Sequence, residues 1–195
     1  MNAEVRELPL FPLNTVLFPG GPLPLRIFEP RYLDMVSQCM REQSGFAVVL
    51  LGEGEEVTSA TTFAATGTEA RIVDFDRLEG GLLGISCVGA ERVRVVEAWR
   101  QPDGLNRGRV LDISADPVVA VPPGQSWMRD MVAEVLPKAG DTYRHVVRRD
   151  DAAWVSNRLA EILPLALGDK QALLELSDPL ERLAALEPAV TRDRG

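Results

Sequence analysis

Apolar positions in the first 115 residues recur in short runs, and Gly, Pro and acidic residues separate these runs. Short runs rich in Val, Ile, Leu and Phe predict β-strands. The expected strands cover residues 7–10, 23–28, 46–52, 69–75, 82–88, 91–99 and 107–113. Strands repeated at such short intervals favour a compact antiparallel or mixed sheet, and they are compatible with closure into a small barrel.

One helix is expected to interrupt these strands. Pro30 suits the first turn of a helix, because its missing N–H would be unpaired there anyway. The apolar residues that then share one helical face are Tyr32, Val36, Cys39 and Met40. Ser44-Gly45 is expected to end the helix, which should cover one opening or face of the sheet.

After Val118 the pattern becomes helical to the end of the sequence. A first helix carries the apolar stripe Trp127, Met131 and Val135, widened by Met128, Val132 and Leu136, with Gly140 as its expected C-terminal cap. Further helices should start near residues 150–151 and near Asp169. The last has Asp178 as N-cap, Pro179 in the first position and Glu181 in a capping box, and Pro188 should close it.

Together these patterns predict an α+β fold of two parts. Residues 1–117 form a β-rich subdomain and residues 118–195 a helical bundle. The helices are too short to bury their own apolar faces, so the bundle should dock on the β-rich part.

Charge and hydropathy exclude several classes of partner. The chain has 195 residues and a formal net charge of −8, which does not provide the positive field that contacts to phosphates require. No nucleic-acid partner is therefore expected. Residues 8–28 are apolar, but five prolines interrupt them, so neither a signal peptide nor a membrane-spanning helix is expected. These properties predict a cytoplasmic protein.

Residues able to carry chemistry are few. Cys39 and Cys87 lie in apolar surroundings and are expected to be buried free thiols, and with the single histidine, His145, they form no metal-binding spacing. Neither Lys138 nor Lys170 follows a glycine-rich phosphate loop, and no Gly-x-Ser-x-Gly elbow is present. The acidic run 74–76 has the spacing of a strand entering a hairpin turn. We therefore expect no catalytic residue, metal or cofactor.

Several stretches resemble a known family. Residues 8–20 (LPLFPLNTVLFPG) and 23–32 (LPLRIFEPRY) look like the opening of the N-terminal domain of Lon proteases, which is shared by short stand-alone relatives and by the Lon-like domain of cereblon. Residues 89–95 (GAERVRV) are similar to the Gly-x-Glu-Arg-x-Arg strand of that family. Residues 163–165 (LPL), 170–175 (KQALLE) and 180–183 (LERL) are similar to its closing helices. These segments occur in the family's order along nearly the whole sequence.

The resemblance implies a PUA-like, β-rich first subdomain and a helical second one. It also implies a non-catalytic module that binds other polypeptides, as the substrate-recognition domain of Lon does, and that serves as an accessory in protein quality control. A weak homo-oligomer is compatible with it. The printed sequence contains no counterpart of the ATPase and serine–lysine protease modules of Lon. Two alternatives remain open: an RNA-binding PUA-like module, and an unrecognised hydrolase that uses His145.

The candidate contact surface is the seam between the two subdomains together with the proline-rich loop, residues 18–22. The residues assigned to it are Phe18, Pro19, Gly20, Pro22, Arg31 and Tyr32. Prolines and glycines expose apolar groups and backbone without committing them to a sheet, which suits recognition of extended chains. The alternatives are that Phe18 plugs the core, and that Arg31 and Tyr32, with Glu29, form an internal ion-pair and packing group.

Overall fold

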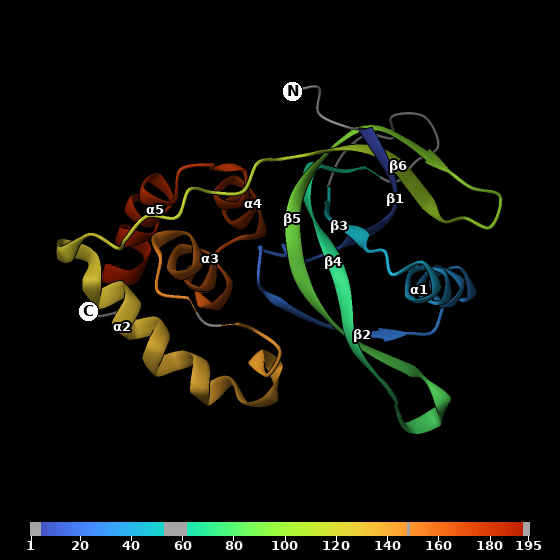
Figure 1. Ribbon diagram of the computed structural model, residues 1–195, viewed down its shortest axis with the longest axis horizontal. Helices are drawn as coiled ribbons and strands as arrows, with labels where there is room; N and C mark the ends of the chain where they lie inside the picture. The colour runs from blue at the N-terminus through green and yellow to red at the C-terminus, as the bar shows by residue number, and fades with distance from the viewer. Residues whose placement is uncertain (1–4, 53–61, 148, 193–195) are drawn as a thin grey trace.

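The computed structural model describes residues 5–52, 62–147 and 149–192, and shows a β-barrel beside a layer of helices (Figure 1). The strands are β1 (Val5–Leu13), β2 (Pro22–Ile27), β3 (Phe46–Leu51), β4 (Phe63–Arg77), β5 (Leu83–Arg100) and β6 (Asn106–Asp112). The α-helices are α1 (Pro30–Glu42), α2 (Ser126–Val135), α3 (Ala152–Ile162), α4 (Leu167–Glu175) and α5 (Pro179–Arg192). Short 3₁₀ segments are η1 (Glu79–Gly81), η2 (Pro123–Gln125) and η3 (Leu136–Tyr143). The predicted α+β class is confirmed.

The strands form one six-stranded sheet in the order β2-β5-β4-β3-β1-β6. An additional pairing of β5 with β6 closes this sheet, which confirms the small barrel. Only β1 and β3 run parallel among these pairs; the others are antiparallel. Because β5 is long, its first half pairs with β2 and its second half with β6.

Strand β5 corrects one prediction. The expected strands 82–88 and 91–99 are a single strand, Leu83–Arg100. The ladder continues through Gly89, whose N–H donates to Gly21 O at 2.8 Å and whose C=O accepts from Gly20 N at 2.7 Å. A Cβ at Gly89 would lie 2.3 Å from the Phe18 carbonyl oxygen, so this close approach of two backbones requires glycine.

The β4–β5 hairpin projects beyond the barrel (Figure 1). The pairing of β4 with β3 reaches only Ala70, so within the described residues the rest of β4 has an open edge. Two amides of this segment are capped locally: Phe75 N donates to Asp74 Oδ1 at 2.9 Å, and Arg77 N donates to Asp76 Oδ1 at 2.8 Å. The acidic run 74–76 thus occupies main-chain donors that a further strand would need.

Helix α1 packs against the barrel interior. Its buried residues Tyr32, Met35, Val36 and Cys39 join a core with barrel side chains such as Phe11 and Phe46. The expected Met40 is instead 42% exposed, because the buried face is rotated toward Met35. The helix ends at Gln43, which has a left-handed conformation with φ of 52°.

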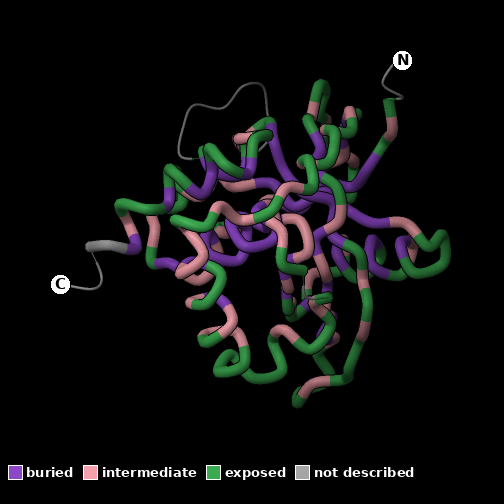
Figure 2. The backbone as a smooth tube through the Cα atoms, turned by 60° about the vertical axis from the view of Figure 1, so that its left-hand side comes forward, coloured by how far each residue is buried: buried purple, intermediate pink, exposed green. Residues whose placement is uncertain are grey.

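Helices α2 to α5 share a second core, and the burial map in Figure 2 shows their inner faces buried and their outer turns exposed. From α2, Met128 and Val132 are fully buried in this core. They are residues expected only to widen the apolar stripe, and each lies one position after a residue of the main stripe, Trp127 and Met131. The N-cap predicted at Asp178 is confirmed, because its Oδ1 accepts from Leu180 N at 2.8 Å. Helix α3 starts where expected, and Asp151 caps it by accepting from Trp154 N at 2.8 Å.

Two predictions about helix ends are wrong. Pro188 does not close α5, which continues to Arg192. The added turn places Val190, fully buried, in the helical core, and this burial offsets the cost of an internal proline. Gly140 has a positive φ of 61° but lies inside η3, so it does not cap α2. Within the described ranges, no helix combines the length and apolar character needed to cross a membrane.

Candidate functional site

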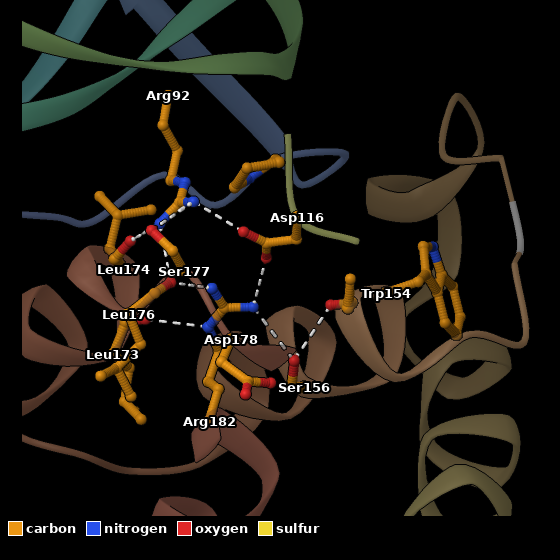
Figure 3. Close-up of polar contacts among 12 residues, drawn as sticks. Arg92, Asp116, Trp154, Ser156, Leu173, Leu174, Leu176, Ser177, Asp178 and Arg182 are labelled. Carbon is orange, nitrogen blue, oxygen red and sulfur yellow. Dashed lines mark hydrogen bonds and ion pairs between the residues drawn. The ribbon is translucent and has the colours of Figure 1, made fainter. Parts of the chain in front are cut away.

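Two buried arginines join the barrel to the helices (Figure 3). Arg92 on β5 donates from Nη2 to Asp116 Oδ1 at 2.6 Å, and Arg182 on α5 donates from Nη1 to Asp116 Oδ2 at 2.7 Å. All three side chains are at least 93% buried. Burial lowers the pKa of Arg92, and the charge of Asp116 opposes this shift. We call these three residues the arginine latch.

The latch also holds the connection between α4 and α5. Arg92 Nη1 donates to the carbonyl oxygens of Leu174 and Leu176, each at 2.7 Å. Arg182 Nε donates to Leu173 O at 2.9 Å, and its Nη2 donates to Leu176 O. Because these carbonyls end a helix, the guanidinium groups supply partners that the helix itself cannot. The latch therefore fixes α4 and α5 against β5.

A second buried cluster ties the proline-rich loop to α3. Arg158, whose side chain is fully buried, donates from Nη2 to Pro19 O at 2.9 Å and to Glu161 Oε1 at 2.5 Å. Tyr143 Oη donates to Glu161 Oε2 at 3.1 Å, and Lys170 Nζ donates to Glu161 O at 2.8 Å. Burial raises the pKa of Glu161 to about 7, although Arg158 acts to lower it.

Between these two ties lies a cavity of about 360 Å³, which we call the seam groove. Its walls come from β5, from the segment that leaves β6, from the loop before α3 and from the first turns of α3. The lining residues are Pro19, Gly20, 88–92, 113–116, Val118, His145, Val147, Arg149, Asp151, Ala153, Trp154 and Asn157. Val118 and Val147 are 82% and 73% exposed, so two large apolar side chains stand at its rim.

The structure separates the six residues assigned to the contact surface. Pro19 and Gly20 line the seam groove. Phe18, next to them, is fully buried in the helical core, the position expected of a core plug. Pro22 begins β2 and lines a neighbouring hollow of about 270 Å³.

Arg31 and Tyr32 lie elsewhere, at the start of α1, where they line a pocket of about 390 Å³ at the barrel. The Arg31 guanidinium donates to Glu29 Oε2 at 2.9 Å and to Gly104 O at 2.8 Å. It also lies over the Tyr32 ring, 4.7 Å from its centroid. These contacts match the alternative of an ion-pair and packing group.

Residues with catalytic potential have other contacts. His145 Nε2 accepts from Arg144 Nε at 2.9 Å and lies 3.6 Å from Asp74 Oδ2. Asp74 also accepts from Arg144 Nη2 at 2.6 Å. Across the described ranges, no group of three or more His, Cys, Asp or Glu side chains is arranged to hold a metal ion. Cys39 and Cys87 are buried free thiols, as predicted.

Sequence reasoning anticipated a seam but missed most residues that form it. Asp116 follows no local pattern, and its partners are 24 and 66 residues away. Val118 belongs to the apolar run Pro117-Val118-Val119, which lies outside every expected strand. Such a run is a local signal of an exposed contact residue.

Comparisons with known proteins agree with this architecture. Residues 7–192 match the family described as the ATP-dependent protease La (LON) substrate-binding domain. The crystal structure of a Lon N-terminal domain protein from Xanthomonas campestris is similar, with 38% identity and a TM-score of 0.78 over 94% of this chain and 98% of that one. The N-terminal domain of a Mycobacterium avium complex Lon protease, at 16% identity and a TM-score of 0.63 over 95% and 98% of the two chains, shows the same fold.

Longer proteins are also similar. Lon protease 1 of Sorangium cellulosum is 29% identical over 98% of this chain and 25% of its own length. Cereblon of Danio rerio is 33% identical over 55% of this chain and 25% of its own length. The chain thus spans about a quarter of the length of these curated relatives. On the family match, which covers nearly all of the described residues, the chain belongs to the Lon substrate-binding domain family.

Proposed function

We propose that this protein binds extended polypeptides in the seam groove, without making or breaking bonds, as an accessory in protein quality control. The family to which it belongs is described by substrate binding, and the substrates of a protease are polypeptides. The observation that carries the proposal is the groove itself, with two exposed valines at its rim and main chain along its wall.

The wall contributed by residues 113–118 suits an extended partner. In the parts of the chain that the structure describes, no main-chain group of residues 114–118 takes part in backbone–backbone hydrogen bonding. The pairing resumes at Val119, whose carbonyl accepts from Ala152 N at 2.8 Å. Unpaired backbone in an extended segment can accept an added strand, which gives affinity that depends little on sequence.

The rim valines supply apolar contact beside this backbone. Exposed apolar side chains that gather at a groove mark contact sites more often than isolated ones do. Val118 comes from the wall segment and Val147 from the loop before α3, so a chain lying in the groove would contact both. Burying a valine contributes about 1.5 kcal/mol, and losing that contribution corresponds to roughly a tenfold change in affinity.

The test is fluorescence polarisation with labelled, tryptophan-free peptides of about a dozen residues that carry apolar residues and a small positive net charge. Val118→Asp and Val147→Asp should each weaken binding about tenfold, and ATP should have no effect. Val96→Asp is the matched control, because Val96 is an exposed valine of β5 that does not line the groove. Equal affinity in all three variants would remove the groove as the binding site.

Three finer statements belong to the same proposal. The chain is divided at residues 117/118 into a barrel and a helical subdomain, the protein acts in the cytoplasm, and its partners are other polypeptides. The net charge of −8 supports polypeptides of neutral or positive charge over nucleic acids. Capture of RNA by the purified protein at physiological salt would contradict this choice of partner.

A further inference from the structure

Unpaired polar atoms gather on the first turns of α3. Among the described residues, buried side-chain atoms without a hydrogen-bond partner include Trp154 Nε1, Asn157 Oδ1, and Nε and Nη1 of Arg158. Trp154 and Asn157 are 7% and 4% exposed, and both line the seam groove. Leaving buried donors and acceptors unpaired is costly, so such groups at a groove indicate a missing partner.

The unpaired groups of Trp154 and Asn157 are one hydrogen-bond donor and one acceptor. The indole N–H of Trp154 only donates, and Asn157 Oδ1 only accepts. The residues are three positions apart on α3, which places their Cβ atoms about 5–6 Å from each other on one face. A residue in an extended chain presents its own N–H and C=O on the same side, as strand pairing requires. One such residue therefore offers an acceptor and a donor of matching kind.

We propose that Trp154 and Asn157 bind the main chain of the polypeptide in the seam groove. Trp154 Nε1–H donates to the carbonyl oxygen of one extended residue, and Asn157 Oδ1 accepts from the N–H of the same residue. This inference rests on the proposed function and adds the feature that is recognised. Because every residue except proline carries both groups, the contact selects extended, non-proline main chain and not a particular side chain.

Access to these atoms depends on the Trp154 side chain. The indole lies between the seam groove and a second cavity of about 260 Å³, lined also by Leu136, Pro137 and Tyr143. Free volume on both sides leaves room for the indole to rotate, whereas a closely packed core side chain is held in place. A shift toward the second cavity opens the groove floor to a bound chain.

The test separates binding from stability. Trp154→Phe removes the donor and keeps an aromatic ring, and Asn157→Leu removes the acceptor at similar volume. Since both groups are unpaired in the free protein, neither change should lower the midpoint of chemical unfolding. Each should weaken binding of the same peptides about tenfold. Trp99→Phe is the matched control, since it makes the identical substitution on β5 outside the groove.

A spectroscopic arm uses the unaltered protein. Adding the peptide should shift the indole N–H NMR signal of Trp154 downfield and leave that of Trp99 in place. If the unaltered protein binds no peptide, the proposed function fails. If it binds while Trp154→Phe and Asn157→Leu keep full affinity, or while the Trp154 signal stays still, the main-chain contact is wrong and the function stands. Loss of stability together with affinity in both variants would assign the two groups to the fold alone.

Discussion

Replacing Asp116 by Asn tests whether the arginine latch holds the barrel and the helices together. The change keeps the shape of the side chain and removes the charge that two buried guanidinium groups share, at 2.6 and 2.7 Å. It also turns one acceptor into an amide donor that faces guanidinium N–H groups. Breaking a buried ion pair by removing one partner typically costs about 3–5 kcal/mol, because the remaining charge stays uncompensated.

We therefore expect Asp116→Asn to lower the free energy of unfolding by about 3–5 kcal/mol. For a chain of this length that corresponds to a fall of roughly 6–20 °C in melting temperature. Urea titration followed by circular dichroism measures the first quantity, and calorimetry the second. The control is Glu134→Gln, which removes an exposed Glu134–Lys138 pair of similar length, 2.8 Å, and should leave stability nearly unchanged because solvent screens the pair.

The outcome that would refute this reasoning is a loss below about 1 kcal/mol for Asp116→Asn. Such a result would mean that the carbonyls of the α4–α5 connection alone compensate the two guanidinium groups. A further variant examines this: Arg182→Met leaves Leu173 O without its guanidinium donor and leaves Leu176 O with Arg92 Nη1 alone, so it should also lower the free energy of unfolding.

Three further predictions concern buried groups. Burial raises the folded-state pKa of Glu161 to about 7, so its contribution to stability is fully present below about pH 4.5 and is lost as pH rises to 7. The free energy of unfolding, measured by denaturant titration between about pH 5 and 8, should therefore fall as pH rises toward 7, and Glu161→Gln should flatten this dependence. Gly89→Ala should lower the free energy of unfolding, measured in denaturant titration, by about 1–3 kcal/mol, because the new Cβ would lie 2.3 Å from a backbone carbonyl oxygen. Gly124→Ala, which has open space around it, should leave stability unchanged. Burial raises the pKa of Cys39 and raises that of Cys87 to about 12, so neither thiol should react with a disulfide reagent at pH 8 until denaturant is added; a fast reaction in the native state would contradict their burial.

Local patterns predicted most elements because each depends on neighbouring residues. Short apolar runs separated by Gly, Pro and acidic residues located the strands, and Asp151 and Asp178 act as caps through contacts two or three residues away. The errors arose where distant contacts overrule local preference. Gly89 was expected to lie between two strands, but its backbone pairs with the proline-rich loop. Pro188 was expected to end a helix, but the helix continues and the helical core buries Val190.

The candidate site was predicted as a region and not as a set of residues. The seam follows from the hydrophobic pattern, since short amphipathic helices need a surface to cover. The latch does not, because a single aspartate that accepts from two distant arginines leaves no periodic signal. For Phe18 the sequence left two alternatives, an exposed loop residue or a core plug, and the structure places the ring in the helical core.

The capped edge of the β4–β5 hairpin has a consequence for how a visiting chain is directed. Where Asp74 and Asp76 hold the amides of Phe75 and Arg77, an approaching strand would have to displace a carboxylate to form each new bond. Residues 114–118, which link the barrel to the helices, require no such displacement of a carboxylate. The protruding hairpin and the segment that links barrel and helices thus differ in how readily their main chain can pair, and under the proposed function a polypeptide would pair with the linking segment rather than with the hairpin edge.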